Sequence, residues 1–355
     1  MTGDGDRALT TIDSQVHNEV PSIDDLLPYL PDLWVEQIAN TVFRGASDGD
    51  APYPPKSALA VRPDSRVDGG PPDLKTVQRQ ALDDRVDAAI LLCTYAVDGL
   101  HNPEQAVAMA RAVNDWQIAQ WLDQDDRLRG SIVVPSQIPQ LAVEEIERVG
   151  GHPGFVQVAL PARSQHPWGS RLNHPLWEAI TRHDLVAGIY FGGAPGNPST
   201  PAGWPSYFIE EYVGMASVFA AQVTNLVVEG VFDLFPSARV TFLESGVTWL
   251  PAHLWRFDKE WRNLRMQTPW VKRPPSQYIR DHVRLTAQPW DMPVDDRLAL
   301  DLFDQLGSQD LLLYSTGFPH QTAGNLEHLL SVVPEEMARR IRSTNAHEWY
   351  RGFGR

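Results

Sequence analysis

Three ionisable side chains lie shortly after apolar runs in the sequence, and their types suit proton transfer or metal binding. His17 lies near the first run, Glu244 directly follows a run near residue 240, and His320 lies near the last run. Imidazoles and carboxylates exchange protons near neutral pH, and both also ligate divalent metals. We therefore take His17, Glu244 and His320 as candidate catalytic residues.

Five further side chains are candidates for substrate binding. Gln15, Tyr190 and Ser315 would form hydrogen bonds to a polarised carbonyl or a developing oxyanion, each contributing about 2–4 kcal/mol in a dry site. Trp204 and Trp249 are candidate walls for an aromatic or apolar substrate. Each candidate also has an ordinary structural explanation, such as a hydrogen-bonded core histidine, a carboxylate bound to loop amides, or an aromatic ring that fills space.

Eight short apolar runs provide the elements that would position these side chains. Runs that are apolar on both faces are typical of strands in a parallel sheet. They are Leu9–Ile12, Ala88–Cys93, Ser131–Val134, Phe155–Leu160, Val186–Phe191, Val240–Leu243, Val283–Ala287 and Leu311–Tyr314. Segments with helical spacing lie between them, including Asp73–Arg85, Pro103–Leu122 and Ser206–Phe235. This alternation predicts an α/β fold, a (β/α)₈ TIM barrel; a doubly wound sheet needs fewer strands and has no G-x-G-x-x-G motif here.

In such a barrel the carboxyl ends of all the strands meet at one mouth. Alternate strand residues share a face, so we expect Asp13, Gln15 and His17 to point together and His17 to converge with Glu244 and Tyr190. Residues 40–72 and 192–205 are rich in Gly and Pro and are predicted to be loops inserted after strands at the same mouth. The whole chain, residues 1–355, is predicted to be one domain.

Composition limits the classes of partner. Thirty Lys and Arg against 45 Asp and Glu give a net charge of −15, which disfavours nucleic acid and anionic lipid. Cys93 is the only cysteine, so no intrachain disulfide or thiolate metal cluster forms. No apolar stretch reaches the length of a membrane span, and the acidic N-terminus does not resemble a signal peptide. We expect a cytoplasmic protein that acts on a small molecule.

Several sequence stretches, in order along the chain, carry a family resemblance. They are residues 12–17 (IDSQVH), 26–31 (LLPYLP), 129–135 (RGSIVVP), 174–177 (HPLW), 242–251 (FLESGVTWLP), 318–320 (FPH) and 345–346 (NA). The chain resembles the amidohydrolase-related family (amidohydrolase 2), whose best-known member is aminocarboxymuconate-semialdehyde decarboxylase, from about residue 10 to 352. The resemblance implies a TIM barrel, small-molecule chemistry and a homo-oligomer.

The resemblance also implies a divalent metal, usually zinc, held by a His-x-His pair, a second His and an Asp. Gln15, Tyr190 and Gly317 stand at three of those four positions, and only His17 remains. Catalytic zinc needs about three protein donors. We therefore predict a site without a metal and no cofactor; the alternative is a divalent metal such as zinc in a rearranged site of His17, Glu244 and His320.

Without a metal, a general base must activate water. We predict a metal-independent hydrolase in which Glu244, with its pKa raised by burial, and His17 form a general acid–base pair. The substrate would be a small ester, lactone, amide or activated C–C bond. Two alternatives stay open: a metal-dependent decarboxylase of the aminocarboxymuconate-semialdehyde decarboxylase type, and a non-catalytic barrel that binds a small molecule. Apolar surface in residues 40–72 and 249–270 also predicts a homodimer.

Overall fold

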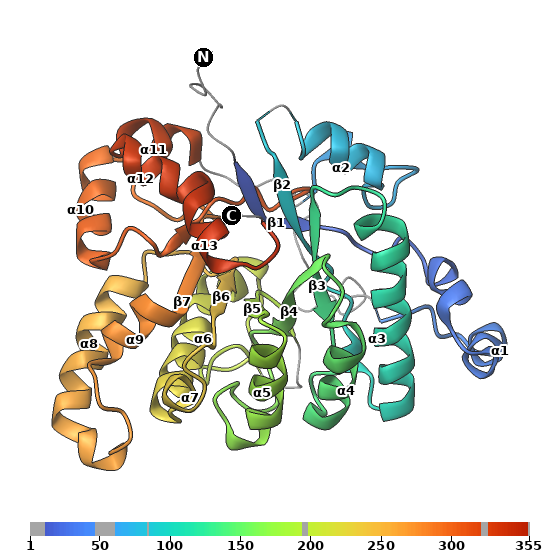
Figure 1. Cartoon of the computed structure of the whole chain (residues 1–355), viewed down its shortest axis with the longest axis horizontal. Coiled ribbons are helices and arrows are strands. Elements are labelled where there is room, and N and C mark those ends of the chain that lie inside the picture. Colours follow the sequence, from blue (N-terminus) through green and yellow to red (C-terminus); the bar gives the residue numbers. More distant parts are fainter. Residues whose placement is uncertain (1–10, 47–60, 84, 194–197, 321–325, 354–355) are drawn as a thin grey trace, which may run out of the picture.

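The computed structural model describes residues 11–46, 61–83, 85–193, 198–320 and 326–353, which form an eight-stranded parallel barrel surrounded by helices (Figure 1). The strands follow one another around the sheet in chain order. They are β1 (Ile12–His17), β2 (Ala88–Leu92), β3 (Leu128–Val133), β4 (Phe155–Pro161), β5 (Val186–Tyr190), β6 (Val240–Leu243), β7 (Val283–Thr286) and β8 (Leu312–Leu313). The predicted (β/α)₈ barrel is confirmed.

The helices cover the outside of the barrel (Figure 1). The α-helices are α1 (Asp32–Asn40), α2 (Leu74–Gln80), α3 (Pro103–Gln117), α4 (Pro139–Val149), α5 (His174–Arg182), α6 (Phe208–Val228), α7 (Val231–Leu234), α8 (Leu250–Leu264), α9 (Pro275–His282), α10 (Asp296–Leu306), α11 (Leu326–Val332), α12 (Glu335–Arg339) and α13 (Asn345–Trp349). Local chemistry sets their ends. The Asn102 side chain accepts hydrogen bonds from the first amides of α3, and Pro103 starts that helix without needing a backbone donor.

The barrel closes between β1 and the segment that follows β8. The Ser14 amide donates to the Tyr314 carbonyl at 2.8 Å, and the His17 amide donates to the Phe318 carbonyl at 2.7 Å. Because β8 itself has only two residues, these bonds to the following segment complete the circle. The closure brings His17 beside the loop that carries His320.

A buried polar network lies at the amino-terminal end of the barrel strands, opposite the mouth. The Tyr350 hydroxyl donates to Gln157 Oε1 at 3.1 Å and lies 2.9 Å from Thr241 Oγ1. The Trp349 indole donates to the same Thr241 oxygen at 2.9 Å. Buried polar groups stabilise a fold only when they have such partners. Residues near the C-terminal end of the chain therefore form part of the barrel core.

Several element boundaries differ from the sequence prediction, and three differences affect the layout. β1 begins at Ile12 and extends five residues beyond the predicted apolar run Leu9–Ile12. The predicted helix over Ser206–Phe235 is two helices, because Gly230 adopts φ +76° between α6 and α7. The insertion at 40–72 follows α1, not β1 directly; its residues 47–60 lie outside the described residues, as do 194–197 of the second insertion.

Apolar side chains are exposed along and after α8, where the sequence predicts subunit packing. Trp255, Leu264, Met266 and Trp270 are 58%, 51%, 87% and 40% exposed. The residues that the structure describes leave these side chains partly exposed, and the homodimer stays a prediction. Among the described helices, none has the length and apolar character that crossing a bilayer requires.

Candidate functional site

His17, Glu244 and His320 meet at the mouth of the barrel. His17 ends β1, Glu244 directly follows β6, and His320 lies in the loop after β8. His17 Nε2 lies 3.3 Å from Glu244 Oε1, and His320 Nδ1 lies 3.9 Å from the same oxygen. The two imidazole rings meet edge to face with their centroids 4.4 Å apart. The structure therefore brings together the three candidate catalytic residues.

Glu244 reaches this position through an unusual backbone conformation. Its φ is +62°, in the left-handed region that costs non-glycine residues about 1–2 kcal/mol. The Thr286 hydroxyl accepts the Glu244 amide at 3.0 Å. Asp291 holds the next turn, because it accepts the Val247 amide at 3.0 Å and the Thr248 hydroxyl at 2.7 Å. Strained backbone held on two sides is typical of functional sites.

The histidines keep the Glu244 carboxyl ionised. Burial alone raises the pKa of Glu244. The hydrogen bond with His17, the positive charges of His17 and His320, and a hydrogen bond with Gln15 lower it by more than burial raises it. The net pKa lies below the usual range for glutamate. The expectation of a net raised pKa for Glu244 is wrong, because the two neighbouring imidazoles outweigh the effect of burial.

Gln15 is the remaining polar neighbour of His17. Its side chain is fully buried, with Nε2 3.2 Å from His17 Nε2 and Oε1 accepting the Thr286 hydroxyl at 3.1 Å. The other His17 nitrogen, Nδ1, is buried and has no hydrogen-bond partner among the described residues. Gln15 thus contacts a candidate ligand through its N–H group, not through its carbonyl oxygen.

The three ionisable side chains fit a divalent cation. One ligand atom from each of His17, Glu244 and His320 lies within 4.8 Å of the others. Metal–ligand bonds of about 2.1 Å place neighbouring ligand atoms about 3–3.5 Å apart, which the 3.3 Å between His17 Nε2 and Glu244 Oε1 matches. Two nitrogen donors and one ionised oxygen donor form a set that accepts zinc or manganese and leaves positions open for other ligands.

A small apolar cluster lies at the same level of the barrel interior. Tyr190 is 5% exposed and packs with Leu92, Ala159 and Leu243. Strand register pairs His17 with Leu92 and Tyr190 with Leu243, so the cluster lies in the strand-end layer that carries His17. The site therefore has an ionic side and an apolar side. A substrate contact by Tyr190 stays a prediction.

The other predicted substrate-binding residues lie in three separate segments, and Ser315 lines a cavity together with His320. Ser315 is buried, and its hydroxyl accepts the Gln288 amide at 3.0 Å. The Trp249 indole donates to the Gly246 carbonyl at 3.2 Å, and its ring packs on Phe242 of the outer core. Trp204 is 53% exposed in the segment before α6. Their roles in substrate binding stay predictions.

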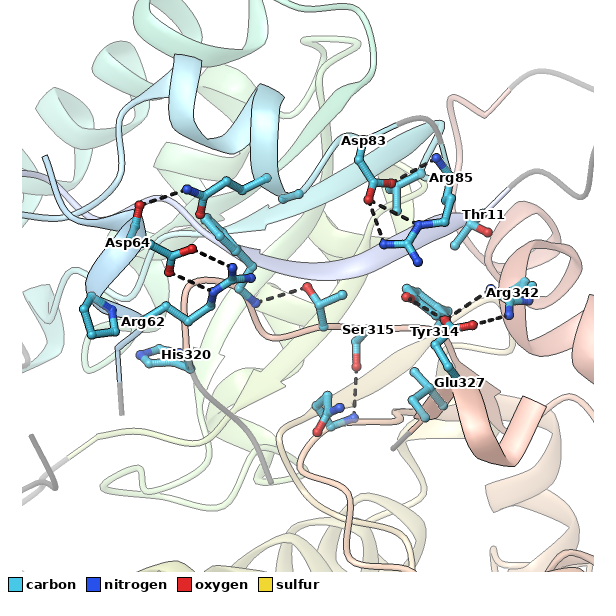
Figure 2. Close-up of a pocket in the computed structure, with 18 residues that line it drawn as sticks. Thr11, Arg62, Asp64, Asp83, Arg85, Tyr314, Ser315, His320, Glu327 and Arg342 are labelled. Carbon is cyan, nitrogen blue, oxygen red and sulfur yellow. Dashed lines mark hydrogen bonds and ion pairs between the residues drawn. The ribbon is translucent and has the colours of Figure 1, made fainter. Parts of the chain in front are cut away.

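A cavity of about 640 Å³ borders the site, with His320 among its lining residues (Figure 2). Three ion pairs line it, so its charges balance: Arg62–Asp64, Arg85–Asp83 and Arg342–Glu327. The Arg62 guanidinium also lies over the Phe318 ring, 5.8 Å from its centroid. Arg62 lies within the predicted insertion at 40–72, where the sequence offered no signal for a cavity wall. A small molecule in this cavity would lie against His320.

Asp13 does not join Gln15 and His17, although alternation along a strand predicts a shared face. The register shifts between Asp13 and Val16, and the Asp13 carboxylate accepts the Thr316 hydroxyl at 2.5 Å and the Thr316 amide at 3.1 Å. Burial raises the pKa of Asp13 from 3.8 to about 6, against the lowering effect of these hydrogen bonds. Asp13 therefore ties β1 to the loop after β8.

We expect Asp13→Asn to change how stability depends on pH. A carboxyl whose pKa is higher in the folded than in the unfolded state contributes stability at low pH and loses it as pH rises towards the folded pKa. Relative to Asp13→Asn, the free energy of unfolding of the wild type should fall by about 2–3 kcal/mol between pH 4 and pH 7. Urea unfolding of both proteins at the two pH values measures this difference. Parallel pH profiles would contradict it.

Comparison with known proteins places the chain among small-molecule enzymes. The family model described as Amidohydrolase matches residues 13–352. The gamma-resorcylate decarboxylase of Rhodococcus jostii (strain RHA1) is 26% identical over 275 residues, which cover 72% of this chain and 79% of that protein.

Two solved structures with the same fold contain manganese. Dihydroxybenzoic acid decarboxylase from Polaromonas sp. JS666, with bound manganese and the inhibitor 2-nitroresorcinol, has a TM-score of 0.66 and 20% identity, covering 96% of this chain and 97% of that chain. 5-Carboxyvanillate decarboxylase from Novosphingobium aromaticivorans, complexed with manganese and 4-hydroxy-3-methoxy-5-nitrobenzoic acid, has a TM-score of 0.66 and 18% identity, covering 97% of each chain.

These findings correct two predictions. The metal-independent hydrolase is wrong because the curated relatives are decarboxylases. The absence of a cofactor is wrong because structural neighbours hold manganese. The physical reason is that Glu244 and His320 supply donors from other strand ends in place of the substituted family positions. The alternative of a rearranged site of His17, Glu244 and His320 therefore fits better, since their ligand atoms lie within 4.8 Å of one another.

Proposed function

The chain belongs to the amidohydrolase family, and from this premise we propose that it is a metal-dependent decarboxylase of a small aromatic carboxylic acid. The observation that carries the proposal is the cluster of His17, Glu244 and His320 at the barrel mouth. These three side chains would hold the cation. The curated relatives, which are gamma-resorcylate decarboxylases, support the reaction type.

The charges of the three side chains suit this role. Glu244 is ionised at neutral pH because its pKa is lowered, so it offers a carboxylate oxygen without first losing a proton. His17 and His320 each offer a ring nitrogen that can ligate a metal in the unprotonated form. A bound divalent cation would supply a Lewis acid that polarises a substrate oxygen.

The apolar side of the site suits an aromatic ring. Leu92, Ala159, Leu243 and the ring of Tyr190 form a nearly buried cluster without charge, which would lie beneath an aromatic ring at the mouth. A carboxylate beside such a surface loses hydration, whereas the CO₂ product is neutral and loses little. In the overall reaction the bond between the ring and the carboxylate breaks, CO₂ leaves, and a proton takes its place on the ring carbon. The apolar wall therefore favours the product over the bound acid.

An assay of CO₂ release tests the proposal. The purified protein, loaded with Mn²⁺, is incubated with 2,6-dihydroxybenzoate and with 5-carboxyvanillate, the acids named for its structural neighbours. We expect CO₂ release that depends on Mn²⁺ for at least one acid, and no hydrolysis of simple esters or lactones. Failure to bind Mn²⁺, or metal-independent ester hydrolysis, would overturn the proposal.

A further inference from the structure

Thr286 is not a ligand candidate, but it contacts the backbone of Glu244 and the side chain of Gln15, the neighbour of His17. It ends β7, a strand that contributes none of the three candidate ligands, and its side chain is fully buried. Its hydroxyl accepts the Glu244 amide at 3.0 Å and lies 3.1 Å from Gln15 Oε1. One hydroxyl therefore connects β6 with β1 across the barrel.

The hydrogen bond to Glu244 acts on a backbone that needs support. At φ +62° the Glu244 amide points away from a regular ladder partner, and the Thr286 oxygen receives it. Without that acceptor a buried N–H group would be unsatisfied, which costs about 1–3 kcal/mol. Loss of the Thr286 hydroxyl therefore weakens the conformation that holds the Glu244 carboxylate near His17.

The hydrogen bond to Gln15 sets the direction of a side-chain amide. The Thr286 proton has two good acceptors, Gln15 Oε1 at 3.1 Å and the Gln288 carbonyl at 3.2 Å. Among the described residues, the buried oxygen Gln15 Oε1 accepts its hydrogen bond from the Thr286 hydroxyl. Buried amide oxygens require a donor, so the hydroxyl orients the amide with its oxygen towards β7.

With that orientation, the N–H group of Gln15 points at His17. Two groups face His17 Nε2 with opposite effects. The Gln15 N–H at 3.2 Å favours a lone pair on this nitrogen, and the Glu244 carboxylate at 3.3 Å favours a proton there. Because metal ligation requires the unprotonated nitrogen, the Gln15 amide shifts this balance towards the form of His17 that can bind a cation.

We propose that Thr286 is a positioning residue of the cation site, because its single hydroxyl supports the Glu244 backbone and, through Gln15, favours the ligating form of His17. The inference rests on the proposed function only in that the site binds a divalent cation. Supporting hydrogen bonds of this kind typically change metal affinity by about 10–100-fold.

Three substitutions test whether the hydroxyl of Thr286 or only its shape matters. Thr286→Val removes the hydroxyl and keeps the shape, and Thr286→Ser keeps the hydroxyl. Thr241→Val is the control, because Thr241 is an equally buried threonine of the neighbouring strand β6 that binds Trp349 and Tyr350 at the opposite end of the barrel. Mn²⁺ affinity is measured by calorimetry, and the His17 tautomer in the metal-free protein by ¹⁵N NMR of the imidazoles, assigned with His17→Asn.

We expect Thr286→Val to weaken Mn²⁺ binding about 10–100-fold and to shift His17 away from the Nδ1–H tautomer. Thr286→Ser should restore both, and Thr241→Val should lower stability while leaving both unchanged. If Thr286→Val fails to fold, Gln15→Leu removes the oriented amide and should alter the tautomer and affinity in the same direction. Unchanged affinity and tautomer, or an equal loss in Thr241→Val, overturns the inference. A wild type that binds no Mn²⁺ defeats the proposed function instead, and the tautomer alone then decides the role of Thr286.

Discussion

Glu244→Gln is expected to weaken Mn²⁺ binding and to lower kcat/KM for decarboxylation, each by about 100-fold or more. Loss of a residue that merely supports a ligand already costs 10–100-fold, so loss of a ligand should cost at least the upper end of this range. Glutamine keeps the shape of the side chain but removes the negative charge beside His17 and His320. The expected loss is therefore one of charge and donor strength, with the fold intact.

Calorimetry with Mn²⁺ and a CO₂-release assay measure the two effects. Glu178→Gln is the matched control, since Glu178 is an exposed carboxylate on α5 that forms a surface pair with Arg182. It should leave affinity and turnover unchanged. His17→Asn should behave like Glu244→Gln, because it removes the second donor of the 3.3 Å pair. Full Mn²⁺ affinity in Glu244→Gln would exclude Glu244 as a ligand.

Removal of metal is expected to abolish decarboxylation and to lower the stability of the protein. A ligand that binds only the folded state stabilises it by about 2.7 kcal/mol when its concentration is a hundred times Kd. The three ligand candidates come from the ends of β1, β6 and β8, so a cation among them would tie opposite sides of the barrel together. Chelation should therefore lower the melting temperature, and added Mn²⁺ should restore both melting temperature and activity.

Glu244→Gln serves as the internal control for chelation. In that variant a chelator should shift the melting temperature little, because the site no longer binds the cation tightly. Scanning calorimetry with and without chelator measures both proteins. If the wild type melts at the same temperature in both conditions and keeps full activity after chelation, a cation has no part in its function.

The sequence was most informative where strands are apolar on both faces. Val240–Leu243 was predicted with the bounds that the structure shows for β6, and β2 differs by one residue. β1 lies later in the chain than the predicted apolar run Leu9–Ile12, because Asp13, Ser14 and Gln15 are polar and do not continue that run. They are buried in the strand because partners from other elements, such as Thr316 and Thr286, satisfy them. Partners so distant in sequence cannot be found from local pattern.

Part of the candidate site followed from the same reasoning. The convergence of His17 with Glu244 was predicted from their places at strand ends, and the distance of 3.3 Å agrees. The metal set of His17, Glu244 and His320 was only the alternative to a site without metal, because it depends on the left-handed backbone at Glu244, which no glycine marks in the sequence. It also depends on His320, whose place follows from how the segment after β8 closes the barrel. Both are properties of the three-dimensional arrangement.

The polar network at the amino-terminal end of the barrel strands has a consequence for folding during synthesis. Tyr350 bonds to Gln157 and Thr241, which precede it by 193 and 109 residues. A ribosome adds residues from the N-terminal side at about 5–20 per second, so β4 and β6 emerge several seconds before Tyr350 exists. Until then the Gln157 and Thr241 side chains lack their hydrogen-bond partner Tyr350. The nascent barrel must therefore wait for residue 350 before its interior can close, and during that interval it offers exposed strands to chaperones or to other nascent chains.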